Sequence, residues 1–540
     1  MFKKNIHLKE SLNKLPKSVD SLKVANNIPN EDTVNRQGFA AYSVEDELHF
    51  VSMLNTLKLE NQFYRTDKEQ MKEIQEYVEK LALKDPYFVA QCIVWSRCMG
   101  EGMRSINYVA AALLAPFISG KDFAKRFYGL FDKKNQKGGC IFRPDDMSEI
   151  KEVYDAISKS TLTNAMKKGF ANAIENLDSY SLLKYKKTIR DIANLVHPKS
   201  ANSKAECTSN GIKVKTIDAI MQNLKVSADT WEVAQSEAGQ IVAKAVKEGK
   251  LTEEKAKEVL KEAKNENWAA LIEDNKLPIL AALRNLNNIL KGDKPEVVEA
   301  VCKLVSNEEL LKKGKIMPYQ IDLAYETVKS NEICSGFNQR LILEALEDGI
   351  EKSVSNLKEI LTGRNLVIMD CSGSMGTRIH TSGKSYTLCS QKAALIAAMI
   401  CKSTNADLIR FGSSAVYSRY SPRDSVFSIA RTIQSDNMGC TNLAAAFDRI
   451  TQENREYDRI FILSDNECNV GSNKTAYKKY VRNIGNPYIY SIDLAAYGTM
   501  PLKSDRVHYF FGYGYAMFDA IASDEFDASK ALDKIRKVVI

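Results

Sequence analysis

Five oxygen-bearing side chains in the C-terminal third of the sequence have the types and the order of a divalent-cation site. They are Asp370, Ser372, Ser374, Thr441 and Asp465. Hard cations such as Mg²⁺ accept carboxylate and hydroxyl oxygens as ligands, with water completing an octahedron. The set therefore predicts a site for one Mg²⁺ or Mn²⁺. The bound ion would keep Lewis acidity toward an incoming carboxylate or phosphate.

The positions of these residues in the sequence support this interpretation. Asp370 ends the apolar run 365–370, and Asp465 ends the apolar run 458–465. In an open parallel sheet, ligands bind outside the carboxyl ends of the strands, so we expect both carboxylates at one edge. The simpler alternative is that Asp370 and Ser372 only cap the helix that follows.

A second group of residues indicates contact with a polyanion. Residues 161–215 hold ten basic and four acidic residues, a net charge of +6, whereas the whole chain has +8. The candidate RNA-binding residues in this stretch are Lys167, Lys168, Lys184, Lys186, Lys187, Arg190, His197 and Lys199. Lys186 and Arg190 are four apart and share a helix face, and clustered cations attract phosphates. The alternative is an ordinary solvated surface.

Motifs of catalysis are not evident, and we expect a protein that is not an enzyme. Gly383-Lys384-Ser385 resembles the end of a Walker A loop, but Arg378 stands where its first glycine is needed. Gly-x-Ser-x-Gly is absent from the sequence. Hydrolysis by two metal ions would need further carboxylates beside Asp370 and Asp465, and no such cluster is evident in the sequence.

The elements that position the cation residues alternate between strand and helix. Apolar runs at 365–370, 407–411, 458–465 and 487–493 predict buried parallel strands, and 391–402 is one of the helical segments between them. We therefore expect a doubly wound α/β domain over 362–540. The basic residues belong to a different region.

Residues 40–360 are predicted to be a succession of helices without strands. Met71, Ile74, Val78 and Leu81 follow the helical period, after a Thr66-to-Glu69 capping box. We expect an irregular α-solenoid, so the fold class is α + α/β. The predicted domains are an N-terminal extension at 1–30, a helical domain at 31–361 and the α/β domain.

Composition places the chain among globular proteins of the cytoplasm. Hydrophobic residues make up 44% of its 540 residues and charged residues 27%. The longest apolar run, 108–118, contains Pro116 and is far shorter than a membrane span. No secretory signal precedes the eleven scattered cysteines, so we expect reduced thiols and no membrane or zinc site.

Residues 362–540 resemble a von Willebrand factor A (vWA) domain with a metal-ion-dependent adhesion site. The five candidate cation ligands match that family's motif in order. Several stretches of the predicted helical region resemble the TROVE module of the Ro autoantigen family. These are 35–38, 48–57 and 61–65, then 184–199, 282–286 and 310–319. TROVE followed by a vWA domain is the Ro arrangement, so the resemblance is to Ro-like proteins of bacteria or phages.

The resemblance implies a ring of HEAT-like helical repeats closed by the vWA domain. It also implies a ribonucleoprotein with small noncoding Y-like RNA, and binding of misfolded or single-stranded RNA ends for RNA quality control or processing. An exoribonuclease or another protein is the implied partner of the cation site. The alternative is a chaperone- or chelatase-associated vWA adaptor with a helical scaffold, which predicts metal-dependent protein binding and no salt-sensitive RNA binding.

Overall fold

The computed structural model describes most of the chain. The described residues are 19–131, 142–158, 161–226, 241–242, 244–248, 252–274, 277–314, 316, 318–330, 334–352, 361–382, 385–434, 437–512, 514, 517–518, 521 and 530–540. The Walker-like residues Gly383-Lys384 and residues 1–18 of the predicted N-terminal extension lie outside them.

The described residues form two compact units that do not follow the order of the chain. The sheet unit draws on the ranges 1–73, 315–322 and 347–533, and the helical unit on 74–314, 323–346 and 534–540. The first described residues therefore belong with the C-terminal sheet. The domain limits predicted from the sequence stay predictions.

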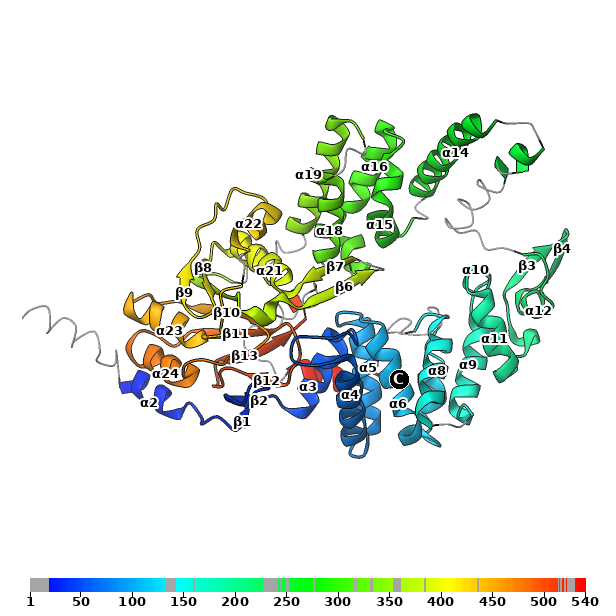
Figure 1. Cartoon of the computed structure of the whole chain (residues 1–540). Helices are drawn as coiled ribbons and strands as arrows, with labels where there is room; N and C mark the ends of the chain where they lie inside the picture. Colours follow the sequence, from blue (N-terminus) through cyan, green and yellow to red (C-terminus); the bar gives the residue numbers. More distant parts are fainter. Residues whose placement is uncertain are drawn as a thin grey trace, which may run out of the picture. The chain divides into compact units, whose positions relative to one another are not determined.

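The sheet unit is built on a six-stranded sheet (Figure 1). In spatial order its strands are β13 (Val507–Phe511), β11 (Tyr488–Asp493), β10 (Arg459–Ser464), β5 (Asn365–Asp370), β8 (Asp407–Phe411) and β9 (Ala415–Tyr417). All neighbouring pairs are parallel except β8 with β9. The chain leaves β5 toward β8 on one side and returns to β10 on the other, so the strand order reverses between β5 and β10.

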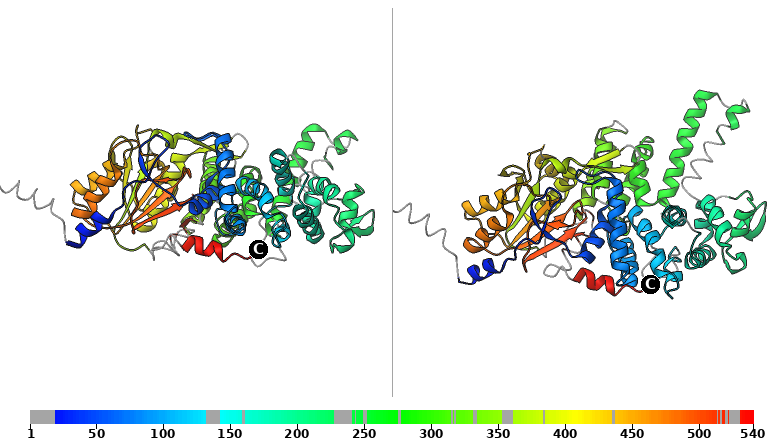
Figure 2. Two further views of the ribbon diagram at one scale, coloured as in Figure 1. Left: turned by 90° about the horizontal axis from the view of Figure 1, so that it is seen from below. Right: turned by 60° about the horizontal axis from the view of Figure 1, so that its bottom comes forward.

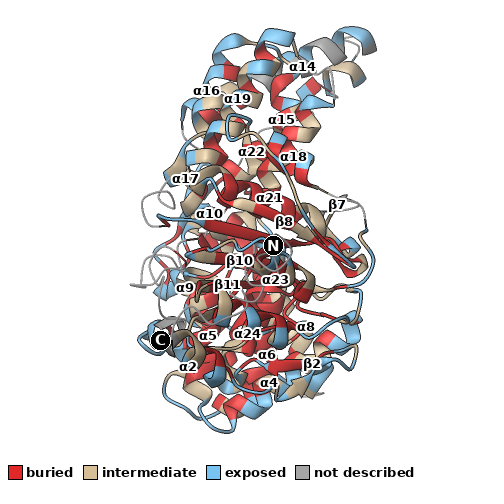
Figure 3. Cartoon of the chain, turned by 90° about the vertical axis from the view of Figure 1, so that its left-hand side faces the viewer, coloured by how far each residue is buried: buried red, intermediate tan, exposed pale blue. Residues whose placement is uncertain are grey.

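Helices cover both faces of this sheet. They are α2 (Val19–Asn27), α21 (Cys389–Thr404), α22 (Val426–Ile433), α23 (Leu443–Gln452) and α24 (Asn473–Asn483). Leu366 and Ile368 of β5 pack with Phe447 and Tyr477 of α23 and α24 in one buried cluster. The other face contacts α21. Both faces are thus buried, and Figure 3 shows the central strands in the colour of buried residues.

The four predicted strands are confirmed. The runs 365–370 and 407–411 correspond residue for residue to β5 and β8, while 458–465 and 487–493 contain β10 and β11. Every residue of β5 is buried, which is why its sequence is a continuous apolar run and not an alternating one. The predicted doubly wound α/β domain is therefore correct.

Residues 33–66 form what we call the strap, which belongs to the sheet unit. It contains β1 (Thr33–Val34), β2 (Ala40–Ser43) and α3 (Asp46–Thr56). β2 pairs with β1 and with β12 (Thr499–Met500), both antiparallel. This three-stranded sheet ties the strap to the segment that follows β11.

The helical unit consists mainly of short helices packed on their neighbours (Figure 2). They are α5 (Pro86–Cys98), α6 (Ser105–Ile118), α7 (Ala124–Phe127), α8 (Asp146–Ser158), α9 (Asn164–Asn176), α10 (Ser179–Lys184), α11 (Lys186–Val196), α12 (Thr216–Met221), α14 (Glu253–Glu273), α15 (Ile279–Leu290), α16 (Pro295–Val305) and α17 (Glu308–Lys313). The helices α4 (Asp67–Ala82), α18 (Pro318–Lys329), α19 (Gly336–Lys352) and α26 (Lys530–Arg536) contribute residues to both units. The predicted helical succession is confirmed, whereas ring closure and the HEAT type of repeat stay predictions.

The start of α4 shows why the local helix signals were reliable. The Glu69 carboxylate accepts a hydrogen bond from Thr66 N at 2.8 Å, and Glu69 N donates to Thr66 Oγ1 at 3.2 Å. This is the predicted capping box, in which each side chain accepts a hydrogen bond from the backbone N–H of the other residue.

The prediction that 40–360 lacks strands was wrong. Besides β2, the chain forms a hairpin of β3 (Glu206–Ser209) and β4 (Ile212–Lys215). Its turn is Asn210-Gly211, with φ of 49° and 80°. Two consecutive positive φ angles suit Asn-Gly, so the hairpin signal was present in the sequence. In the described part of the chain, no helix is both long and apolar enough to cross a membrane.

Candidate functional site

The predicted cation residues lie where the strand order of the sheet reverses. Asp370 is the last residue of β5, and Asp465 follows the last residue of the neighbouring β10. Met369 pairs with Leu463, so the two carboxylates leave the sheet at the same edge. Such a switch point is the usual ligand crevice of a doubly wound sheet.

The Asp-x-Ser-x-Ser loop is held by its own hydrogen bonds. Asp370 Oδ1 accepts from Ser372 N at 2.8 Å, and Asp370 Oδ2 accepts from Ser464 Oγ at 2.6 Å. The hydroxyl oxygens of Ser372 and Ser374 are 3.2 Å apart. The Ser374 hydroxyl also hydrogen-bonds to Asp465. Four of the five predicted ligands are thereby brought together.

The loop that carries Thr441 lies directly against this motif. Gly373 N donates to Gly439 O at 3.1 Å, and Met438 N donates to Cys371 O at 2.7 Å. Gly439 has φ of +87°, and a Cβ there would lie 2.4 Å from Ser413 Oγ, so the close approach needs glycine. Thr441 is therefore delivered to the site by backbone contacts between two loops.

The alternative that Asp370 and Ser372 only cap the helix that follows is not supported. Ser372 stands at the N-cap position of the 3₁₀ turn η2 (Gly373–Gly376), but no side chain caps this turn with a hydrogen bond. The α-helix α21 begins only at Cys389. Between them β6 (Arg378–Ser382) and β7 (Ser385–Leu388) form an antiparallel hairpin. The backbone N–H of Leu388, at the start of α21, donates to Gln391 Oε1 at 2.8 Å.

The five predicted ligands are almost fully buried, with exposed fractions between 0% and 3%. Burial raises the pKa of Asp370, although hydrogen bonds from Ser464 and Ser372 oppose it. Burial raises the pKa of Asp465 well above its usual range, and the charge of Asp370 adds to the rise. Neither carboxylate has a Lys, Arg or His ion-pair partner among the described residues.

Two buried carboxylates without a counter-charge, surrounded by three hydroxyls, fit a hard divalent cation. Buried charge is costly unless it is compensated, and a cation in this donor set would compensate it. When bound, the cation would supply a Lewis acid for an anionic oxygen. Among the described residues, no group of three or more His, Cys, Asp or Glu side chains is placed to hold a metal, so this site depends on hydroxyl ligands.

The strap contributes contacts at this edge that sequence reasoning missed. Arg36 N donates to Glu467 Oε2 at 2.8 Å, and Asn35 Nδ2 donates to Cys468 O at 2.6 Å. Burial raises the pKa of Glu467 to about 7, although the Arg36 N–H opposes it. These contacts join residues more than 400 positions apart, so no local pattern predicts them.

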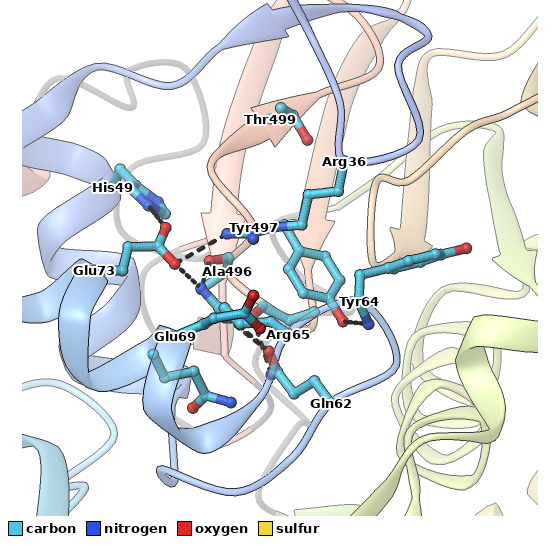
Figure 4. Close-up of polar contacts among 12 residues, drawn as sticks. Arg36, His49, Gln62, Tyr64, Arg65, Glu69, Glu73, Ala496, Tyr497 and Thr499 are labelled. Carbon is cyan, nitrogen blue, oxygen red and sulfur yellow. Dashed lines mark hydrogen bonds and ion pairs between the residues drawn. The ribbon is translucent and has the colours of Figure 1, made fainter.

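Arg65 is the anchor of the strap (Figure 4). Its side chain is fully buried, and it donates to Ala495 O at 2.8 Å and Ala496 O at 3.1 Å. Its charge is paired with Glu73 Oε2 at 2.7 Å, and its guanidinium carbon lies 5.0 Å from the centre of the Tyr497 ring. A buried arginine with this many partners fixes the strap on the segment after β11.

Tyr64, next to Arg65, reaches the predicted cation residues. Burial raises the pKa of Tyr64 to about 12 and the charge of Asp465 adds to the rise, whereas a hydrogen bond with the Ser374 hydroxyl opposes it. The Tyr64 ring packs edge-on against Tyr497, with centroids 5.7 Å apart. Tyr64 was noted in the sequence only as part of a family resemblance.

The predicted RNA-binding residues lie on consecutive elements of the helical unit. Lys167 and Lys168 are in α9, Lys184 ends α10, Lys186, Lys187 and Arg190 are in α11, and His197 and Lys199 follow it. Lys168, Lys186, Lys187, His197 and Lys199 are exposed, and the other three are partly buried. The helix boundary at Tyr185 separates Lys184 from the row on α11.

Local contacts orient several of these side chains. Lys186 Nζ donates to Val226 O and Arg190 Nη1 to Asn223 Oδ1, each at 3.1 Å, so the two share a face of α11 as predicted. His197 ends α11 with φ of +52°. The exposed Lys213 lies on the hairpin β3–β4, which adds basic residues that the prediction had placed in a helical region.

A doubly wound sheet with an Asp-x-Ser-x-Ser loop at its switch point is the arrangement of a vWA-type domain. A family model described as the Ro60 vWA domain matches residues 364–488, and one described as the TROVE domain matches residues 242–360. The TROVE match is thus followed along the chain by the Ro60 vWA match, which is the order seen in Ro-like proteins. These findings support a Ro-like RNA-binding protein.

A solved structure supports the fold. The crystal structure of the Deinococcus radiodurans Ro (RSR) protein matches with a TM-score of 0.56 and 17% sequence identity, over 89% of this chain and 100% of that chain. Because the TROVE match begins at residue 242, the resemblance of residues 35–65 and 184–199 to TROVE stretches stays a prediction.

Proposed function

We propose that the protein forms a ribonucleoprotein with small noncoding Y-like RNA, and that it binds misfolded or single-stranded RNA ends for quality control or processing. The observation that carries this proposal is the basic surface over α9, α10 and α11. Exposed lysines there have few acidic neighbours in sequence, and polyanion binding requires clustered cations. The match to a TROVE domain followed by a Ro60 vWA domain indicates the class of RNA that we propose.

Salt dependence tests the RNA proposal. Replacing Lys184, Lys186 and Arg190 together by Ala should flatten the slope of log K against log salt by about two to three, because each phosphate contact contributes roughly 0.7–0.9. His197→Ala should lower affinity with little change of slope, because an imidazole contacts bases by stacking or hydrogen bonding. The assay is filter binding of the co-purified RNA across salt concentrations.

A charge-matched control separates this surface from a general loss of positive charge. The triple variant Lys291→Ala, Lys303→Ala and Lys313→Ala removes the same charge from exposed positions on or beside α15, α16 and α17. It should keep the wild-type slope. If both triple variants behaved alike, the surface over α9, α10 and α11 would not be the RNA site.

We further propose that the vWA domain binds one Mg²⁺ or Mn²⁺ through Asp370, Ser372, Ser374, Thr441 and Asp465. The buried, uncompensated pair of carboxylates beside three hydroxyls favours this assignment. A cation there would accept a carboxylate or phosphate oxygen, such as one from an exoribonuclease or another protein partner. Without RNA binding, the same site would support the alternative of a vWA adaptor.

Calorimetry with Mn²⁺ tests the cation proposal. Asp370→Ala should abolish binding, because it removes one of only two charged ligands. Asp424→Ala, which removes an exposed carboxylate of the same domain, should bind as the wild type does. Circular dichroism of both variants checks that the fold is kept. Undiminished Mn²⁺ affinity in Asp370→Ala would refute the assignment.

A further inference from the structure

The loop that carries the predicted cation ligand Thr441 is joined to the strap by hydrogen bonds. Thr441 N donates to Asn469 Oδ1 at 2.8 Å, and Asn469 Nδ2 donates to Gln37 Oε1 at 3.2 Å. Gln37 Nε2 donates to the Tyr64 hydroxyl. A relay of hydrogen bonds therefore runs from the Thr441 loop into the strap and ends at the Tyr64 hydroxyl.

The direction of each hydrogen bond in this relay is set by its neighbour. Gln37 uses its amide oxygen to accept from Asn469, so its amide nitrogen is left to donate to Tyr64. The Tyr64 oxygen accepts that bond. Its ring is fixed by edge-on packing against Tyr497, with centroids 5.7 Å apart.

The Gln37 end of the relay is fixed by independent contacts. Asn35 Oδ1 accepts from Gln37 N at 3.1 Å, while Asn35 Nδ2 donates to Cys468 O. Asn469 also binds the Thr441 loop a second time, because Asn469 N donates to Thr441 O at 3.0 Å. Gln37 is thus held at the loop after β10, not left as a free surface amide.

We propose that Gln37 and Tyr64 are positioning residues of the cation site, so that cation binding and docking of the strap reinforce each other. The relay ties the Thr441 loop to the strap through Asn469 and Gln37, and the Tyr64 hydroxyl holds the Gln37 amide in place. Because coupling between two binding events is reciprocal, a strap that favours the cation must itself be held more firmly when the cation is bound. This inference rests on the proposed cation site.

The first measurement is Mn²⁺ affinity of the full-length protein by calorimetry. Tyr64→Phe keeps the ring packed on Tyr497 but removes the hydroxyl, and Gln37→Ala breaks the relay one step earlier. Each should weaken Mn²⁺ binding about threefold to tenfold, the scale of one hydrogen bond. Both substitutions act through one relay, so their effects should not add. The double variant should bind Mn²⁺ with about the affinity of the more severely affected single variant.

The matched control is Tyr42→Phe. Tyr42 is a buried tyrosine of the same strap, but its hydroxyl donates to Pro29 O and takes no part in the relay. This variant should bind Mn²⁺ as the wild type does. It separates loss of the relay from a general loosening of the strap.

The second measurement is hydrogen exchange of strap peptides 35–43 and 61–66, with Mg²⁺ or with a chelator. Mg²⁺ should slow exchange of these peptides in the wild type and in Tyr42→Phe, but not in Tyr64→Phe or Gln37→Ala. If Gln37 and Tyr64 only stabilised the fold, their replacement would not remove the effect of Mg²⁺ on hydrogen exchange of the strap.

The outcomes distinguish this inference from the cation proposal on which it rests. If the wild type binds no Mn²⁺, the cation assignment itself is wrong. If the wild type binds Mn²⁺ and Asp370→Ala does not, the assignment stands. In that case, wild-type affinity in either relay variant, or strap exchange that ignores Mg²⁺, overturns the positioning role alone.

Discussion

Replacing Glu73 by Gln should destabilise the anchor of the strap in a way that depends on pH. Glu73 contacts Arg65 at 2.7 Å, Arg36 at 2.9 Å and His49 at 3.1 Å (Figure 4). Burial raises the pKa of Glu73, but the hydrogen bonds from His49 and Arg65 and the charges of Arg65 and Arg36 outweigh it and lower the pKa to about 2. The carboxylate is therefore held ionised by its partners.

The size of the effect follows from that shift. A glutamate has a pKa near 4.5 when it is unperturbed, so the difference of about 2.5 corresponds to about 3 kcal/mol of unfolding free energy at neutral pH. Because the pKa is lower in the folded state, this contribution is present above about pH 4.5 and is lost as pH falls toward 2. More than half of it should be gone by about pH 3. Arg65, left buried without its counter-charge, accounts for a loss of this size.

Hydrogen exchange at β2 and β12 measures this loss locally, which avoids treating two compact units as one two-state system. Glu73→Gln should lower the opening free energy of these strands by about 3 kcal/mol at pH 7 and by much less near pH 3. Glu79→Gln removes the same charge from an exposed position of α4. This control should change the opening free energy of the two strands by less than about 0.5 kcal/mol. A pH-independent loss in Glu73→Gln would refute the ionic explanation.

Two further predictions concern the cation site and the helical unit. Mn²⁺ affinity should fall as pH is lowered, because burial holds the pKa values of Asp370 and Asp465 above their usual range and a cation must displace their protons. Calorimetry in buffers of different ionisation enthalpy should show proton release, and constant affinity would contradict the prediction. Gly169→Ala should destabilise the α7–α9 contact by about 1–3 kcal/mol, because its Cβ would lie 2.7 Å from the Tyr128 backbone. Hydrogen exchange of α9 peptides measures this destabilisation. Gly336→Ala is the control, because a Cβ at Gly336 meets nothing within 4 Å. Equal exchange of α9 in the two variants would contradict the predicted clash.

The sequence was informative where the physical cause is local. Strands buried on both faces are largely apolar, which is why β5 was predicted residue for residue. The capping box at Thr66 needs only residues three apart, and the order of the cation ligands follows from strand ends. The Asn210-Gly211 turn was equally local, and the hairpin it forms was overlooked, not hidden.

Long-range pairing decided the rest. β13 and the strap were not predicted, because their partners lie elsewhere in the chain. Arg65 illustrates the reason: from the sequence it is an ordinary surface cation, yet it is among the largest fully buried side chains. Only the tertiary structure brings it to the Ala495 and Ala496 carbonyls, 430 and 431 positions away, which makes burial of its charge favourable. Residue types and order thus determined the sheet and the candidate ligands, whereas the attachment of the strap beside that site depends on contacts that no local pattern records.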